Sequence, residues 1–159
     1  MSHYVMHKLA SIFFILFILI GISNADSLYQ KEDNVSENET TLYIYRPNLF
    51  FNVASSPSVF LDDQKLFDLR NNTYSVVHIS PGEHTLLVQR SMPRSRWYAG
   101  PMTFTHSFKA NETYYIRISP EQPKSSMQGE VVAKAGNASI MLTSETAAQP
   151  EISKTRRLN

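Results

Sequence analysis

The chain has 159 residues, 15 basic and 14 acidic side chains, a formal net charge of +1 and no cysteine. This length suits one ordinary domain, and the lack of cysteine excludes disulfides, thiol nucleophiles and cysteine metal sites. The balanced charge excludes a strong attraction of the whole surface to nucleic acid or membrane, so any charge preference must be local.

The first 25 residues have the pattern of an export signal. Lys8 precedes an apolar run from Leu9 to Ile22, and small residues follow up to Ala25, where a signal peptidase cleaves. We expect cleavage between Ala25 and Asp26, which gives a periplasmic or secreted protein. The alternative is an uncleaved membrane anchor over residues 9–25, although this uncharged run is at the lower limit for spanning roughly 30 Å of hydrocarbon.

The next segments predict a flexible leader and the first strands. Residues 26–39 are polar and without period, as in mobile leaders. Residues 40–46 alternate apolar and polar side chains and predict a strand that Pro47 ends. In the loop 48–57 we expect Phe50 and Phe51 to pack back onto the sheet. Residues 59–69 predict a hairpin with Asp62 to Lys65 in its turn.

Two β-rich runs then meet at Ser80-Pro81-Gly82-Glu83. Pro81 presets φ for a type II turn, and Gly82 can adopt the positive φ that the next position needs. We predict a hairpin across this turn, in which Val77 opposes Leu86. The face of this hairpin that we expect to pack in the core carries Val77, Ile79, His84, Leu86 and Val88.

The rest of the chain predicts two more strand pairs and a short helix. Residues 102–108 and 113–118 form an expected hairpin, and residues 130–134 and 139–143 flank a Gly136-Asn137 turn. Ser144 is expected to start a C-terminal helix whose length Pro150 limits. The basic tail that follows is expected to be solvated; it contains Lys154, Arg156 and Arg157.

Short strands separated by turn residues, with no long amphipathic helix after the signal helix, predict an all-β fold. We expect an antiparallel β-sandwich, immunoglobulin-like or prealbumin-like, of about 7–9 strands. The expected organisation is a signal peptide over residues 1–25, a leader over 26–39, the β-sandwich over 40–143, and a C-terminal helix and tail over 144–159.

Five blocks of sequence occur in the order seen in one family: residues 41–47, 59–66, 72–74, 81–86 and 113–117. With these blocks the chain resembles the bacterial family called domain of unknown function 2846, over roughly Thr40 to Pro120. The Pro-Gly-x-His element at Pro81 is also similar to PEGA domains and to β-sandwiches of the carboxypeptidase regulatory kind. The resemblance implies a non-catalytic module of an exported protein and implies no reaction. Asp63 stands where the family usually has glycine, and the lipoprotein cysteine of many relatives is missing.

Histidines are the only candidates for catalysis. His78 and His84 flank the Pro81-Gly82 turn on opposite faces, which makes the pair a poor metal chelate. We interpret His84 as a core-edge imidazole that is hydrogen-bonded to backbone near the turn. Asp62 and Asp63 are interpreted as turn formers rather than calcium ligands. We therefore expect no enzyme and no cofactor; the alternative is a metal-dependent or hydrolytic envelope enzyme that uses His78, His84 or His106.

The loop from Arg90 to Pro101 is the best candidate binding surface, because its arginines could bind anions and its aromatic rings could stack on a ligand. The candidate residues are Arg90, Arg94, Arg96, Trp97 and Tyr98. The other interpretation is that Trp97 closes one end of the sandwich. The expected function is an exported, non-catalytic β-sandwich that binds an unknown protein or an envelope glycan through this loop or an edge strand. We expect no nucleic acid partner, and contact with a membrane only if the N-terminal segment stays uncleaved.

Overall fold

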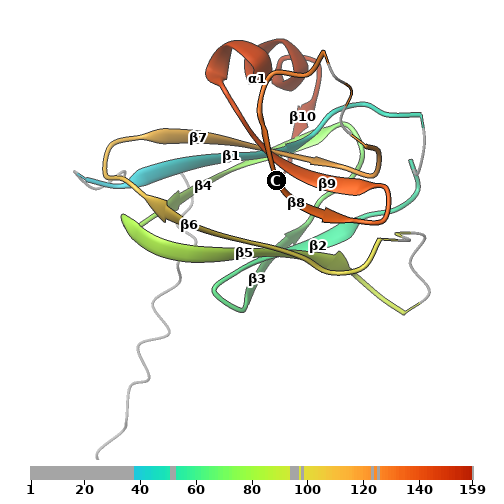
Figure 1. Cartoon of the computed structure of the whole chain (residues 1–159), viewed down its shortest axis with the longest axis horizontal. Coiled ribbons are helices and arrows are strands. Elements are labelled where there is room, and N and C mark those ends of the chain that lie inside the picture. Colours follow the sequence, from blue (N-terminus) through green and yellow to red (C-terminus); the bar gives the residue numbers. More distant parts are fainter. Residues whose placement is uncertain are drawn as a thin grey trace, which may run out of the picture.

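The computed structural model describes residues 38–50, 53–93, 97, 99–122, 124 and 126–158. Two β-sheets face each other, and one helix lies on the outer side of the larger sheet (Figure 1). This arrangement confirms the predicted all-β sandwich. The elements are β1 Thr40–Arg46, β2 Pro57–Leu61, β3 Gln64–Asp68, β4 Thr73–Ile79, β5 Gly82–Arg90, β6 Met102–Phe108, β7 Thr113–Ser119, β8 Glu130–Ala135, β9 Ala138–Thr143, α1 Glu145–Ile152 and β10 Arg156–Arg157.

The larger sheet has the strand order β10-β4-β1-β7-β9-β8, and the smaller sheet has the order β3-β2-β5-β6. Most neighbours are antiparallel, but β1 pairs with β7 in parallel and β10 pairs with β4 in parallel. The predicted antiparallel sandwich is therefore confirmed for most strand pairs, and these two parallel pairs are the exceptions. Long stretches of chain separate the members of both parallel pairs, so no tight turn forces them to run in opposite directions.

Several local predictions are confirmed. Strands β1 and β6 have the predicted bounds, and β8 and β9 pair across Gly136. The hairpin of β2 and β3 turns at Asp62 and Asp63, whose φ angles are 46° and 65°. Two successive residues with positive φ are the mark of a type I′ turn, which favours Asp and Asn. This turn is shorter than the predicted turn over residues 62–65.

Two predicted hairpins are not hairpins. Strand β4 pairs with β1 in the larger sheet, whereas β5 pairs with β2 and β6 in the smaller sheet. The chain therefore crosses from one sheet to the other at Pro81-Gly82. Strands β6 and β7 are divided between the sheets in the same way. Alternating side chains indicate which face of a strand is buried. They do not indicate whether two successive strands pair in one sheet or lie in two facing sheets, because the alternation is the same in both cases.

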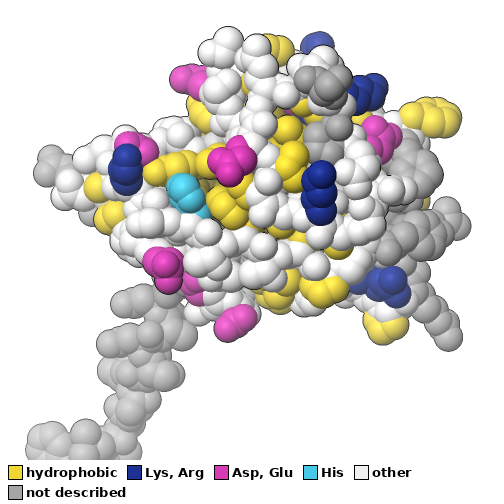
Figure 2. Space-filling model, in the orientation of Figure 1, with side chains coloured by type: hydrophobic (Ala, Val, Ile, Leu, Met, Phe, Trp, Pro, Cys, Tyr) yellow, Lys and Arg dark blue, Asp and Glu magenta, His cyan; other side chains and the backbone are white. Residues whose placement is uncertain are grey.

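The core between the sheets contains the residues predicted for it. Val77 and Ile79 face it from the larger sheet, and Leu86 and Val88 face it from the smaller sheet; all four are at most 2% exposed. Further core residues from both sheets are Leu42, Ile44, Val59, Leu61, Met102, Phe108, Ile116, Ile118 and Ile140. On the face shown in Figure 2, acidic and basic side chains are interspersed, as the balanced composition predicts.

Helix α1 packs on the outer face of the larger sheet, where Ala148 and Ile152 contact Tyr45 and Tyr115. The predicted cap is confirmed, since the Ser144 hydroxyl accepts a hydrogen bond from the backbone of Ala147. Pro150 lies inside the helix, which ends two residues later.

One other prediction was wrong. Phe50 does not pack back onto the sheet but is fully exposed, while Phe51 lies outside the described residues. The basic side chains of the tail are exposed, as predicted, but the backbone of Arg156 and Arg157 also forms strand β10 on the edge of the larger sheet. A two-residue strand is too short to show a period in the sequence, so only its docking on β4 identifies it.

Candidate functional site

The residues of the predicted Arg90–Pro101 binding surface do not lie together on one surface. The Arg90 side chain is exposed and donates from Nε to the Trp97 carbonyl at 3.2 Å and from Nη1 to the Pro93 carbonyl at 3.1 Å. Trp97 has 0% exposure and belongs to the core between the sheets. Its ring therefore offers no face on which a ligand could stack. Arg94, Arg96 and Tyr98 lie outside the described residues.

Trp97 contacts a buried cation. The guanidinium carbon of Arg46 lies 5.6 Å from the centroid of the Trp97 ring, within the range of a cation–π interaction. Arg46 also donates from Nη1 to the Ser55 carbonyl at 2.6 Å. Burial lowers the pKa of Arg46 to about 10, so the side chain remains a cation at neutral pH. This contact fixes one end of the sandwich rather than forming a surface for a partner.

The three candidate catalytic histidines have different surroundings. His78 lies in the larger sheet, with its Nδ1 atom 3.3 Å from the Thr41 hydroxyl. His84 and His106 are opposite each other on β5 and β6. The His106 ring, however, stacks on Phe104 with a centroid distance of 5.4 Å. Within the described part of the chain, no group of three or more His, Cys, Asp or Glu side chains could hold a metal ion.

His84 forms a polar clasp with Ser80 and Asp62. Its Nδ1 atom lies 2.5 Å from Asp62 Oδ2, and its Nε2 atom lies 2.9 Å from the Ser80 carbonyl and 3.4 Å from the Ser80 hydroxyl. The other Asp62 oxygen accepts the Thr85 backbone N–H at 2.8 Å. These residue types resemble a hydrolase triad. The nearer acceptor for Nε2 is the carbonyl, so the ring holds the backbone and has no lone pair directed at the Ser80 hydroxyl. The predicted imidazole bound to backbone near the turn is confirmed.

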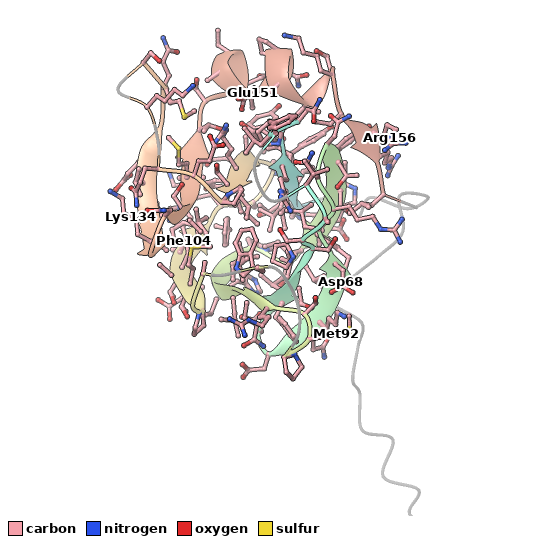
Figure 3. The ribbon with its side chains drawn as sticks, turned by 90° about the vertical axis from the view of Figure 1, so that its right-hand side faces the viewer. Asp68, Met92, Phe104, Lys134, Glu151 and Arg156 are labelled. Atoms are coloured by element: carbon pink, nitrogen blue, oxygen red, sulfur yellow. The ribbon has the colours of Figure 1, made fainter. Side chains whose placement is uncertain are left out.

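A different site lies between helix α1 and the larger sheet. A pocket of about 300 Å³ opens there, between the helix, strands β1, β7 and β9, and residues 126–128. Its polar lining comes from Tyr45, Arg117, Ser126, Gln128, Thr143, Thr146 and Glu151, and its apolar lining from Met127, Met141, Ala147 and Pro150. This volume is at the lower end of the range for small-molecule sites. Figure 3 shows Glu151 at the helix layer, above the sheets.

Arg117 is the central residue of this pocket. It lies on β7 and is only 3% exposed, and its Nε and Nη2 atoms donate to Glu151 at 2.8 Å and 3.3 Å. The third nitrogen, Nη1, is buried and has no hydrogen-bond acceptor among the described residues. A buried donor on a charged group is costly when it is not hydrogen-bonded. The residue that carries this unused donor lines the pocket, and the donor itself is covered by its neighbours.

Tyr45 completes the network on the floor of the pocket. Its hydroxyl donates to Glu151 Oε2 at 3.1 Å and lies 3.4 Å from the Thr143 hydroxyl. Burial raises the pKa of Tyr45 well above its ordinary value, and the neighbouring Glu151 charge adds to the rise. The phenol is therefore neutral and a dependable hydrogen-bond donor at physiological pH. Because Arg117 and Glu151 cancel each other, the described residues that line the pocket carry no net charge.

The sequence interpretation missed this site because its parts are far apart in the chain. Arg117 and Glu151 are 34 positions apart, and only the docking of α1 on the sheet brings them together. One signal was present: Arg117 stands between Ile116 and Ile118 in an otherwise apolar run. A charge in such a run needs a buried partner, but the sequence did not indicate which carboxylate would provide it.

Comparison with known proteins gives one match. The model of a family described as "Protein of unknown function (DUF2846)" matches residues 36–131, which confirms the resemblance found in the sequence. The likeness to PEGA and carboxypeptidase regulatory modules stays a prediction. No curated protein and no solved structure matches the chain.

Proposed function

Because the chain belongs to the family described as "Protein of unknown function (DUF2846)", whose description gives no activity, we propose a function from the pocket itself. The protein is a non-catalytic β-sandwich module of the cell envelope that binds a neutral carbohydrate unit in the pocket around Arg117. Export by the N-terminal signal, with cleavage after Ala25, is part of this proposal. No helix in the described part of the chain is long and apolar enough to cross a membrane, and residues 1–37 lie outside that part.

The observation that carries the proposal is the buried Nη1 atom of Arg117, which has no acceptor among the described residues. A ligand oxygen that displaces the groups covering Nη1 would make a hydrogen bond to a charged donor, which contributes about 1.5–3 kcal/mol. The donor is already oriented, because Glu151 holds the other two nitrogens of the same planar group. Little conformational entropy is then lost when the ligand binds.

The lining supports a neutral ligand with many hydroxyl groups. The Arg117–Glu151 pair leaves no net charge to attract an ion, while hydroxyl and amide groups from Ser126, Gln128 and Thr146 can exchange hydrogen bonds with sugar hydroxyls. Met127 and Met141 provide apolar contact for the C–H face of a sugar ring. Among the described lining residues, an ionised ligand would find only one charged donor without an acceptor, and it would bring an uncompensated charge into a half-buried site.

The surroundings of the histidines support a binding role over a catalytic one. His84 is engaged by Asp62 and the Ser80 carbonyl, and His78 lies in the other sheet. None of the three histidines lines the Arg117 pocket. A catalytic site requires a base within reach of the bound substrate, and the nearest ionisable groups in this pocket are already paired with each other.

The test is titration of the purified protein with neutral di- and trisaccharides of hexoses and of N-acetylhexosamines, followed by backbone amide NMR. We expect saturable shifts at residues 126–128, 141–147 and 117. Arg117→Lys keeps the positive charge beside Glu151 but removes the Nη1 donor. It should weaken binding about tenfold or more, the effect of losing roughly 1.4 kcal/mol.

The matched control is Arg90→Lys, which makes the same replacement at an exposed site far from the pocket. It should leave the affinity within about twofold of the wild-type value. Circular dichroism and urea melts of each variant establish that the fold is retained. A panel without saturable shifts at this pocket would refute the proposal, and so would equal affinities for the wild type and the folded Arg117→Lys variant.

A further inference from the structure

A second pocket lies at the edge of the sandwich where β3, β4 and β10 come together. Its volume is about 470 Å³, and it is lined by Arg70, Thr73, Arg156 and Arg157, with Phe67 and Leu158 as apolar walls. Asp68 also lines it and is the only acidic side chain among the described residues that do so. Figure 3 shows Asp68 and Arg156 along the same edge of the molecule, opposite Lys134. The pocket shares no lining residue with the Arg117 pocket.

The backbone that carries these arginines is held in place by hydrogen bonds. The Thr73 hydroxyl donates to the Arg70 carbonyl at 2.7 Å. Strand β10 docks on β4 through bonds from the Arg156 N–H to the Asn72 carbonyl at 3.0 Å and from the Leu158 N–H to the Tyr74 carbonyl at 2.8 Å. Arg156 is thus fixed directly opposite Thr73. Sites on such fixed elements place their charged groups more accurately than sites on free tails.

Among the described residues that line this pocket, basic side chains outnumber acidic ones. The Asp68 carboxylate is already engaged, since its Oδ1 atom accepts the Ser58 hydroxyl at 2.5 Å and lies 2.9 Å from the Lys65 ammonium. Lys65 shares Asp68 with Arg70, and the guanidinium groups of Arg70 and Arg156 bring their positive charges to the same hollow. Like charges that converge in this way repel each other, and an anion between them would remove the repulsion.

We propose that Arg70 and Arg156 form a binding site for a phosphate group. A phosphate has several oxygens in a tetrahedral arrangement and a charge beyond −1, so it can accept forked hydrogen bonds from more than one guanidinium. A carboxylate is planar and satisfies one such fork. The apolar walls formed by Phe67 and Leu158 exclude water from one side of the anion and strengthen its attraction to the arginines. A soluble phosphate compound and a lipid headgroup would present the same chemistry.

The test uses inorganic pyrophosphate as the probe, at low ionic strength so that screening is weak. Amide NMR of the wild-type protein should show saturable shifts at Thr73 and at residues 156–158. The double variant Arg70→Gln, Arg156→Gln should bind pyrophosphate at least about tenfold more weakly than the wild type, because two charged donors are lost. The control Lys124→Gln, Lys134→Gln removes the same two charges at exposed positions elsewhere and should change the affinity by less than about twofold.

Co-sedimentation with vesicles distinguishes the two sources of phosphate. Vesicles of phosphatidic acid that retain the wild-type protein but not the arginine double variant, and release it when pyrophosphate is added, would support a headgroup. Pyrophosphate binding without retention on these vesicles would support a soluble phosphate compound. Both double variants keep residues 1–37, so a difference between them reports on the pocket alone. The proposal is overturned if pyrophosphate causes no saturable shift in the wild type, or if the two double variants weaken binding equally.

Discussion

Asp62 in the turn between β2 and β3 and His84 near the start of β5 are joined by a contact of 2.5 Å between Oδ2 and Nδ1. The same carboxylate accepts the Thr85 N–H, and the same imidazole donates to the Ser80 carbonyl. One pair of side chains thus ties a hairpin turn to the segment where the chain crosses from the larger sheet to the smaller one. His84 and the Pro81-Gly82 turn were visible in the sequence, but the crossing between the sheets and the connection through Asp62 were not.

This contact predicts a difference between two adjacent aspartates. Asp62→Asn keeps a residue that tolerates positive φ but weakens the hydrogen bonds to His84 and Thr85, so it should lower the free energy of unfolding by about 1–2 kcal/mol. Asp63→Asn is the matched control, because Asp63 also has positive φ and is exposed. It should change the stability by less than about 0.5 kcal/mol. Equal shifts of the two urea midpoints would show that the clasp contributes nothing.

A second prediction concerns the crossing itself. Gly82 has φ +139°, a conformation that side chains with a Cβ atom rarely adopt, although a Cβ here would meet nothing within 4 Å. Gly82→Ala should therefore cost about 1–3 kcal/mol of stability through backbone strain alone. The control is Gly100→Ala, where the added Cβ meets Ala135 at an ordinary 3.8 Å. Urea melts of both variants test this, and a wild-type midpoint for Gly82→Ala would contradict it.

The positions of the strands could be predicted from the sequence far better than the pairing between them. Alternation around Val77 and Leu86 predicted that both are buried, and both are. The prediction that they oppose each other in one hairpin was wrong, because Pro81-Gly82 allows either a tight turn or a crossing between sheets. Which of these forms depends on long-range pairing of β4 with β1 and of β5 with β2 and β6. Such pairing is set by packing across the core, which a local pattern does not encode.

The candidate sites could be predicted only in part, for a related reason. The sequence placed several arginines and one tryptophan in a single loop, and local composition suggested a shared surface. The fold instead buries Trp97 beside Arg46, and it builds the two candidate pockets described above from residues that are distant in the chain, such as Arg117 with Glu151 and Arg70 with Arg156. Both pockets depend on the C-terminal segment docking against the larger sheet, which no pattern in that segment indicated.

The burial of Trp97 gives a spectroscopic prediction, because it is the only tryptophan in the chain. Its fluorescence should be quenched weakly by iodide in the folded protein and strongly after unfolding in urea. The double variant Trp97→Phe, Met92→Trp moves the indole to a position where the native side chain is 66% exposed, and its folded state should be quenched readily. Strong quenching of the folded wild-type protein would mean that Trp97 is exposed and would restore it as part of a binding surface.

The last prediction is a pH dependence that arises at Asp68. Partial burial raises the pKa of this carboxyl, but the Ser58 hydroxyl and the Lys65 ammonium outweigh burial, so its pKa in the folded state lies below the ordinary value. The unfolded chain then binds a proton at Asp68 more readily than the folded chain does. The charged carboxylate therefore stabilises the fold at every pH above its unfolded pKa of about 3.9, and this contribution is lost as the pH falls through the lower folded value.

Asp68→Asn should consequently be less stable than the wild type at pH 7, and the difference should shrink as the pH is lowered below about 4. Ser58→Ala removes one of the three groups that lower the pKa of Asp68, the others being Lys65 and Arg70. The stability of this variant should therefore change less between pH 7 and low pH than the stability of the wild type does. Urea melts of the three proteins at a series of pH values measure both effects. A stability difference between Asp68→Asn and the wild type that stays constant from pH 7 to the acid limit would contradict the prediction, because the loss would then come from packing and not from the ionised carboxylate.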